Sequence, residues 1–350
     1  MIKKLQLVRK KKELKKQVTT ETIEDHREEV LAKGRKFKYP FQYAKHRLVI
    51  NAILIGVVSV LLLVGAGWLL LYQLQSTNDM LYRFTKVIPL PVAKVDGENV
   101  RFSDYLMILK SSLAALEAQE GAFDGSKEEA EVMWRQYQRQ ALDSAVEFTY
   151  ALKLARELEI EVTREMIEEA GREHRTVDGV ERSEESFTKI ILANFGLQVE
   201  EYERLLLLSL TRREVAAAID RDANSLAEEV WELLESGGGD FAGVAGALAG
   251  KVSYEATGGL VSTMNLDGGR AAVANGLKVG QWSERFVSRN GDGFYFVKLL
   301  AKDDGLVEYV SLKIPFGEFE RRMKRLREEG SVEEHVRLGR AEEERGGWGS

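Results

Sequence analysis

The chain has 350 residues with a net charge of -6, and its 44% apolar and 30% charged residues allow two packed domains with additional segments. It contains no cysteine, which excludes disulfide scaffolds, thiolate zinc sites and a cysteine nucleophile. The four histidines lie far apart and match no metal-ligand spacing, so we expect no metal site.

The charges are distributed unevenly along the chain. Residues 1–47 carry 15 Lys and Arg against six Asp and Glu, which predicts a basic tail, and residues 48–78 carry no charge of either sign. Residues 79–350 carry 35 basic and 50 acidic side chains, a net charge of -15. A body of this charge repels phosphate backbones, so we expect no nucleic-acid partner.

The uncharged run contains a long apolar segment, residues 48–72, with the sequence LVINAILIGVVSVLLLVGAGWLLLY. A helix of about 20 residues crosses the hydrocarbon core of a bilayer. Trp68 and Tyr72 lie near one end, where amphipathic rings favour the membrane interface. A cleaved signal peptide would have a shorter apolar core of about 7–15 residues. The segment is therefore predicted to be a transmembrane helix, with the lipid bilayer as its partner.

Flanking charge predicts the orientation of this helix. The twenty residues before it contain six basic side chains, whereas the twenty residues 79–98 contain three. Because the excess of Lys and Arg stays on the cytoplasmic side, we expect residues 1–47 in the cytoplasm and the large C-terminal part outside the cell membrane.

Residues 73–91 are expected to be a linker, since Pro89 and Pro91 favour extended backbone before them. A small hairpin around Asp96-Gly97 follows. Helical periodicity then dominates as far as residue 219, which predicts a mostly helical domain over 92–219. Its expected helices cover residues 103–119, the stripe from 134 to 155, and residues 163–174, 183–195 and 199–219.

The composition changes after residue 220. Glycine becomes frequent, and helices are expected at 225–235, 241–248 and 316–328. Residues 294–300 and 306–314 are rich in aromatic and β-branched side chains, which predicts strands. The expected fold class is therefore α+β overall, with a second domain at 220–328 and a charged, disordered tail at 329–350.

Two stretches carry a family resemblance. The sequences PVAKVDGENVRFSDY (91–105) and GLQVEEYERLLLLSLTRREVAAAI (196–219) resemble the N-terminal helical domain of SurA/PrsA-type extracytoplasmic chaperones. The segments LAEEVWELLESGGGDFAGVAG (226–246), GGL (258–260) and LKVGQWSERFVSRNGDGFYFVKLL (277–300) resemble the parvulin (PpiC-type) domain of the same proteins. The resemblance implies a membrane-anchored folding helper that binds unfolded exported polypeptides.

The parvulin resemblance also implies a peptidyl-prolyl isomerase (rotamase) site that needs no cofactor, and this sequence departs from the pattern of that site. The family uses two histidines, but no histidine lies between His174 and His335. The resemblance places the last-strand histidine at Tyr295, and the methionine and phenylalanine of the pocket near Leu266 and Arg270. The candidate proline-pocket or peptide-binding residues are accordingly Met264, Leu266, Phe286, Phe294 and Tyr295.

Three functions remain open on the sequence. The first is a chaperone whose isomerase activity is lost or weak, because activity depends on the site rather than on the fold. The second is an active isomerase that uses Tyr295 with apolar walls formed by Phe286, Phe294 and Met264. The third is an envelope scaffold that binds no unfolded client.

Overall fold

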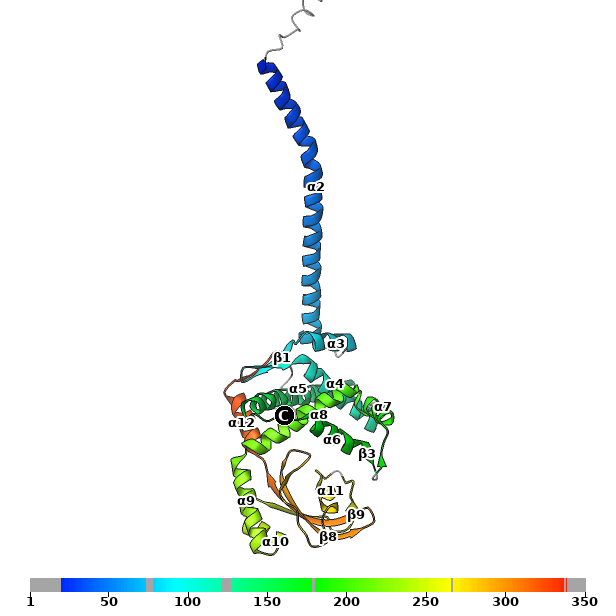
Figure 1. The fold of residues 1–350 in the computed structure, drawn as a ribbon, viewed down its shortest axis with the longest axis vertical. Coiled ribbons are helices and arrows are strands. Elements are labelled where there is room, and N and C mark those ends of the chain that lie inside the picture. Colours follow the sequence, from blue (N-terminus) through cyan, green and yellow to red (C-terminus); the bar gives the residue numbers. More distant parts are fainter. Residues whose placement is uncertain are drawn as a thin grey trace, which may run out of the picture. The chain divides into compact units, whose positions relative to one another are not determined.

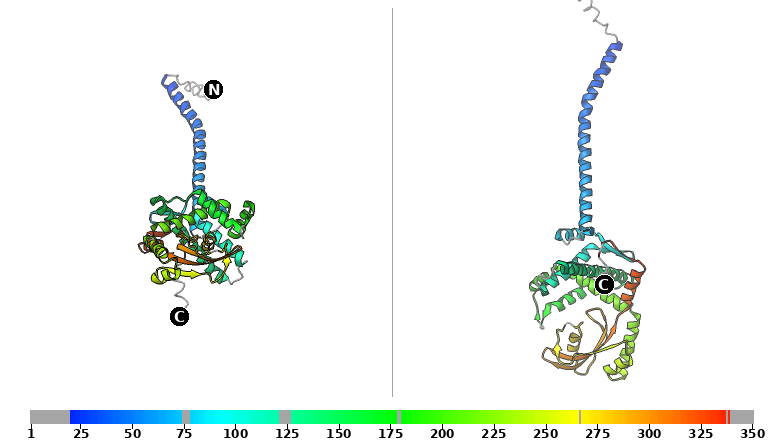
Figure 2. Two further views of the ribbon diagram at one scale, coloured as in Figure 1. Left: turned by 60° about the horizontal axis from the view of Figure 1, so that its bottom comes forward. Right: turned by 180° about the vertical axis from the view of Figure 1, so that it is seen from behind.

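A computed structural model describes residues 20–73, 78–120, 127–177, 180–265, 267–336 and 338. The chain divides into two compact units, Met1–Leu69 and Leu70–Ser350, each of which is described by itself. Figure 1 labels the elements, and Figure 2 gives two further views of them.

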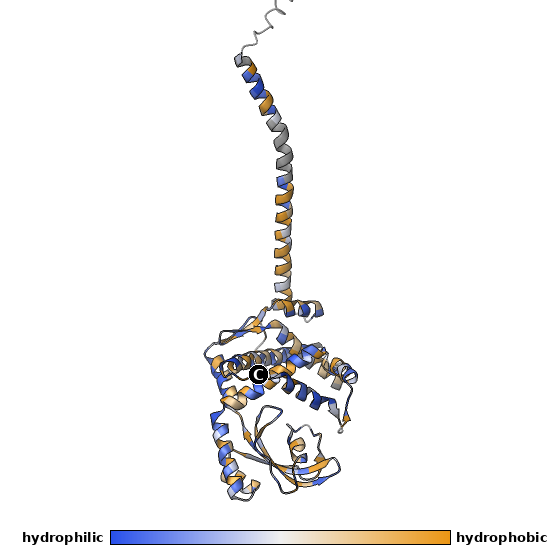
Figure 3. Cartoon of the chain, viewed as in Figure 1, coloured by the Kyte–Doolittle hydropathy of each residue, from blue (hydrophilic) through white to orange (hydrophobic). Residues whose placement is uncertain are grey.

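The described part of the first unit is one long helix, α2 (Thr20–Trp68), after which the chain continues as a π-helical turn, η1 (Leu69–Gln73). Among the described residues, one segment is long and apolar enough to cross a membrane, His46–Tyr72. In Figure 3 the corresponding part of the α2 ribbon is coloured mostly orange, as hydrophobic residues are. Its apolar side chains are exposed, as expected of a helix whose partner is lipid rather than protein.

The second unit contains a helical region whose helices between residues 102 and 219 match the predicted ones closely. The structure corrects the predicted linker, residues 73–91: a helix, Asp79–Val87, forms within it because Tyr82 and Thr85 pack into the core. The turn between β1 (Pro91–Val95) and β2 (Glu98–Arg101) has positive φ angles at both Asp96 and Gly97, as Asp-Gly in a tight hairpin favours. The remaining elements are α3 (Asp79–Val87), α4 (Phe102–Glu120), α5 (Lys127–Glu157), α6 (Arg164–Arg175), β3 (Thr176–Val177), β4 (Val180–Glu181), α7 (Glu184–Phe195) and α8 (Val199–Ile219).

Local sequence signals end and begin these helices. The Ser183 side chain accepts a hydrogen bond from the N–H of Ser186 at the start of α7, and the Thr163 hydroxyl does the same for Met166 at the start of α6. Gly196 ends α7 in the left-handed conformation with φ of 61°. The predicted stripe of α5 packs inward, since Ala141, Ala145 and Ala155 of this helix are buried in the helical core.

The C-terminal segment returns to this helical core. Phe319 and Met323 of α12 (Glu318–Glu328) are buried in it, and β10 (Val332–Glu334) pairs antiparallel with β1. The sequence groups residues 316–328 with the second domain and treats 329–350 as disordered. In the structure, α12 instead packs in the helical region, and residues 332–334 form a strand because they pair with the free edge of β1.

The sheet region lies between α8 and α12. Its antiparallel sheet has the order β5-β9-β8-β7, and β6 also pairs with β9. Helices α9 and α10 cover one face, whereas α11 packs against the other. The bounds are α9 (Arg221–Ser236), α10 (Phe241–Ala247), β5 (Ser253–Ala256), β6 (Val261–Ser262), α11 (Arg270–Asn275), β7 (Phe286–Val287), β8 (Gly293–Asp303) and β9 (Leu306–Pro315).

A buried carboxylate, Asp220, joins the starts of α9 and α12. Its Oδ1 accepts a hydrogen bond from the N–H of Ala223 at 3.0 Å. Its Oδ2 accepts from Gly317 and Glu318 at 2.7 and 2.9 Å. Burial alone would raise the pKa of Asp220, but these backbone donors outweigh burial and hold the pKa below its usual range.

Candidate functional site

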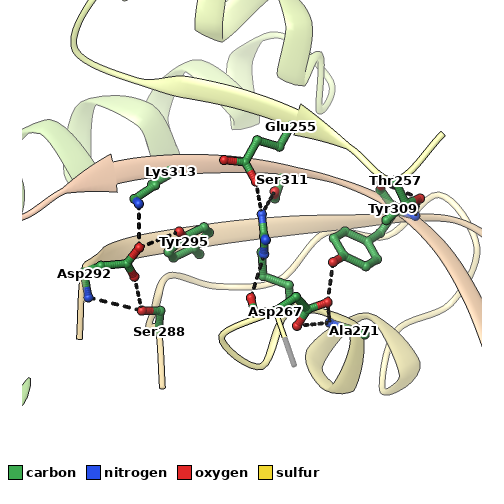
Figure 4. Close-up of polar contacts among 11 residues, drawn as sticks. Glu255, Thr257, Asp267, Ala271, Ser288, Asp292, Tyr295, Tyr309, Ser311 and Lys313 are labelled. Atoms are coloured by element: carbon green, nitrogen blue, oxygen red, sulfur yellow. Dashed lines mark hydrogen bonds and ion pairs between the residues drawn. The ribbon is translucent and has the colours of Figure 1, made fainter. Parts of the chain in front are cut away.

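The candidate site is a polar network on the face of the sheet that α9 does not cover. Successive strand residues point to opposite faces, and the register pairs Tyr295 with Lys313 and Val297 with Ser311. Hence Tyr295, Ser311 and Lys313 share one face, whereas Phe296 and Leu312 lie on the other. Figure 4 shows the network on the first of these faces.

One half of the network is centred on Asp292, directly before β8. Its carboxylate accepts hydrogen bonds from the Ser288 hydroxyl, from the Lys313 ammonium and, at 3.2 Å, from the Tyr295 hydroxyl (Figure 4). Burial would raise the pKa of Asp292, but these donors outweigh it and lower the pKa. Burial and the neighbouring Asp292 charge raise the pKa of Tyr295, so its phenol stays protonated at neutral pH.

The other half is centred on Arg270 at the start of α11. Its guanidinium forms an ion pair with Glu255, donates to the Ser311 hydroxyl at 3.2 Å and lies 5.2 Å from the centre of the Tyr295 ring. Asp267 accepts a hydrogen bond from the Tyr309 hydroxyl (Figure 4). Burial and this carboxylate raise the pKa of Tyr309.

The structure brings together two of the five predicted pocket residues and separates two others from them. The rings of Phe286 and Tyr295 stack with centroids 6.2 Å apart. Phe294 lies on the opposite face, buried against Phe316. Met264 follows β6, which pairs with β9 around Val261↔Val307 and thus at the other end of β9 from the Tyr295 pairing. Leu266 lies outside the described residues.

Sequence reasoning missed most of the network. It did not single out Asp292, Lys313 or Ser311, although β9 alternates polar and apolar residues from Tyr309 to Ile314. That alternation of period two is the signal that assigns Tyr309, Ser311 and Lys313 to one face.

The chemistry of the network is that of a closed set of ion pairs and hydrogen bonds. Its acidic groups, Glu255, Asp267 and Asp292, each bind a donor within the network. No imidazole lies among the network residues described. The His174 ring contacts the Tyr202 hydroxyl in the helical region. The backbone N–H of His335 donates a hydrogen bond to the carbonyl of Val92 in β1. The described residues also contain no cluster of His and carboxylate side chains able to hold a metal.

A more open hollow lies on the other face of the sheet. It has a volume of about 490 Å³, and the side chains of Trp231 and Phe296 line it, stacked with centroids 6.3 Å apart. Ala227 and four charged side chains, three acidic and one basic, complete its lining: Glu228, Glu232, Glu284 and Arg285. We call these residues the aromatic groove.

A second hollow, of about 270 Å³, is lined from α5, α8 and the turn before β8. Three of its lining residues are arginines, but each is ion-paired: Arg212 with Glu147 and Glu320, Arg213 with Glu214, and Arg289 with Glu173. Because these pairs neutralise the arginines, the hollow offers no concentrated positive charge to an anion.

The comparisons with known proteins add one finding. The family model of the SurA-like N-terminal domain matches residues 41–216, half of the chain, which includes the apolar segment and nearly all of α8. No curated protein and no solved structure matches the chain.

Proposed function

Because the chain belongs to the SurA-like N-terminal domain family, we propose that it is a membrane-anchored extracytoplasmic chaperone that binds unfolded exported polypeptides. The family match is the observation that carries the proposal. The sheet region extends the proposal by resemblance alone: we assign it a parvulin-like fold whose isomerase activity is lost or weak.

The apolar segment supports the anchoring. His46–Tyr72 is long enough to span a bilayer, and the basic excess before it favours a cytoplasmic N-terminus. Residues 79–350, which we call the body, carry a net charge of -15. In this orientation the body lies where polypeptides emerge from the membrane. Protease added to intact cells is expected to degrade the body, and its survival would contradict this orientation.

The aromatic groove is the surface that we propose for clients. Trp231 is partly exposed and supplies the accessible apolar surface, and fully buried Phe296 stacks beneath it. Unfolded chains expose apolar side chains, and apolar contact stabilises their binding. The structure gives Glu228, Glu232 and Glu284 no ion-pair partner among the residues it describes, so the groove complements apolar segments that carry a neighbouring Lys or Arg.

The polar network supports the loss of isomerase activity. An isomerase must favour the twisted X–Pro amide over its planar form. Here the donors nearest the predicted pocket, Tyr295, Lys313 and Arg270, are already bound to carboxylates or hydroxyls of the chain. The network therefore holds the sheet face together and leaves few groups to stabilise a substrate.

The proposal is tested by measuring how the full chain, reconstituted in lipid nanodiscs, suppresses aggregation of an unfolded test protein with basic apolar segments. We expect suppression by the natural chain and a clear loss in the double variant Glu228→Lys, Glu232→Lys. Glu229→Lys is the matched control, since Glu229 is exposed on the same helix but does not line the groove.

Two outcomes would contradict the proposal. If the natural chain suppresses no aggregation yet co-purifies with one defined partner, the protein is a scaffold. If suppression persists equally in the double variant and in Glu229→Lys, clients bind elsewhere and the aromatic groove is excluded.

A further inference from the structure

A helix near the start of the second unit, α3, has three chemically distinct sides. Successive helical residues are rotated by about 100°. Its inner side packs Tyr82 and Thr85 into the body, and its polar side carries Asp79, Arg83 and Lys86. The third side consists of Met80, Phe84 and Val87, whose spacings of 4 and 3 gather them within an arc of about 60°, and exposed Ile88 directly follows the helix. We call these four residues the outer stripe.

The outer stripe is exposed and held in place. Met80 and Val87 are 81% and 82% exposed, and Phe84 and Ile88 are also exposed. The helix cannot rotate this stripe inward without breaking the Lys86–Glu201 ion pair at 3.1 Å and the Lys110–Asp79 pair at 3.0 Å. Both lysines also lie within 6 Å of the centre of the Tyr82 ring, which is buried on the inner side.

Connectivity determines what can cover the outer stripe. The candidate span ends at Tyr72, and α3 begins at Asp79. The six intervening residues extend at most about 20 Å, so α3 stays close to the interface wherever the span ends. Helices that lie in this interface place an apolar side against the acyl chains and basic residues beside the headgroups. The outer stripe, with Arg83 at its margin, has this arrangement.

We propose that α3 is an interfacial helix that inserts its outer stripe into the headgroup region of the bilayer and so holds the body against the membrane surface. The inference rests on the anchoring proposed above, and its occupant is the lipid surface. It adds a second contact with the bilayer to the client-binding body, beside the packing of Leu71 and Tyr72 at the end of the span.

The absence of cysteine makes a direct test possible in the full chain. Single cysteines are introduced as Val87→Cys in the outer stripe, Ile53→Cys in the span and Val279→Cys at an exposed apolar position of the sheet region. Each is labelled with a nitroxide in nanodiscs of phosphatidylcholine and phosphatidylglycerol. Collision rates with oxygen, which partitions into lipid, and with a water-soluble nickel chelate are then compared.

We expect the label at Ile53 to be accessible to oxygen and shielded from nickel, and the label at Val87 to show the same preference at shallower depth. The label at Val279 is expected to favour nickel. Adding Met80→Gln and Phe84→Gln to the Val87→Cys chain leaves Tyr82 and Thr85 in place, and should shift the Val87 label several-fold toward nickel.

The outcomes separate the two proposals. A Val87 label as accessible to nickel as the Val279 label, with Ile53 still in lipid, would overturn the interfacial helix and leave the anchor intact. A nickel-accessible label at Ile53 would overturn the anchor and, with it, the interfacial helix. A Val87 label that stays in lipid after both glutamine substitutions would contradict the role assigned to the outer stripe.

Discussion

The two faces of the sheet in the second unit are built from alternate residues of the same strands, yet they differ in chemistry. On the face covered by α9 and α10, Phe294, Phe296 and Leu312 form a buried apolar cluster. On the other face, Tyr295 and Lys313 belong to a network of ion pairs and hydrogen bonds, and a smaller apolar cluster under α11 lies beside this network. Adjacent residues of β8 therefore serve different purposes.

The difference shows how stability and ligand binding are distributed in this region. Apolar burial stabilises in proportion to the area removed from water, so the α9 face, which has the larger buried apolar cluster, supplies more of the stability than the α11 face. The polar face gains less, because its hydrogen bonds replace bonds to water. The aromatic groove lies where the apolar face reaches the surface at Trp231, and it is there that we expect ligand binding.

The largest effect is expected for Phe296→Ala on the apolar face. Phe296 is fully buried against Trp231, and its removal leaves a cavity that should cost about 3–5 kcal/mol. Denaturant unfolding of the full chain in detergent, followed by tryptophan fluorescence, measures the change. Leu300→Ala on the same strand is the control, because Leu300 is 41% exposed. If it lowers the free energy of unfolding as much as Phe296→Ala does, burial on the α9 face is not the source of the stability.

Asp220→Asn tests the attachment of α9 to the start of α12. We expect it to lower the free energy of unfolding by about 2 kcal/mol. The amide keeps one acceptor oxygen, so the bonds to Ala223 or those to Gly317 and Glu318 are lost. Urea unfolding of the full chain at neutral pH measures this change. An unchanged midpoint would show that the bonds of Asp220 do not stabilise the attachment of α9 to α12.

The same carboxylate predicts a pH dependence. Because the folded-state pKa of Asp220 is lowered, its stabilisation is complete above the unfolded value of about 3.9 and is lost as the pH falls through the folded value. Asp220→Asn should therefore lose less stability than the natural chain when urea unfolding is repeated at acidic pH. An equal acid sensitivity of the two chains would assign the effect to other carboxylates.

On the polar face, Asp292→Asn should destabilise by about 1 kcal/mol, since Asp292 is partly exposed and water can replace part of what is lost. Thermal unfolding compares it with the exposed pair variant Lys189→Ala, which we expect to be neutral within about 0.5 kcal/mol. A loss as large as that of Phe296→Ala would show that the two faces contribute equally.

The smallest effect is expected for Tyr295→Phe. It removes one hydrogen bond to Asp292 at 3.2 Å and keeps the ring stacked on Phe286, so stability should change by at most about 1 kcal/mol. Isomerisation of a proline-containing peptide should proceed at the same rate with either chain. A rate above the uncatalysed level that falls in Tyr295→Phe would show that the polar face is catalytic.

Local sequence signals predicted much of the helical region. Ser183, Gly196 and the Asp96-Gly97 turn act through their own backbone neighbours, so a single sequence contains the information. The return of α12 and β10 to the helical core could not be predicted this way. It depends on β10 pairing with β1, more than 200 residues earlier, and on Phe319 and Met323 fitting a core built from other helices.

The candidate site illustrates the same limit. Asp267 and Tyr309 are 42 residues apart, and Arg270 and Ser311 are 41 apart, so no local pattern joins them. One error could have been avoided: Phe294 and Tyr295 are neighbours in a strand and must point to opposite faces, so they could not line one pocket. The family resemblance selected those residues, and strand geometry separates them.

The central claim is that the protein binds unfolded polypeptide without accelerating proline isomerisation. One experiment measures both, using a client whose refolding is slowed by X–Pro isomerisation and whose unfolded state aggregates. With the full chain in nanodiscs, we predict less aggregation and a slow refolding phase of unchanged rate. Undiminished aggregation, or a slow phase that quickens in proportion to the concentration of the chain, would contradict the account.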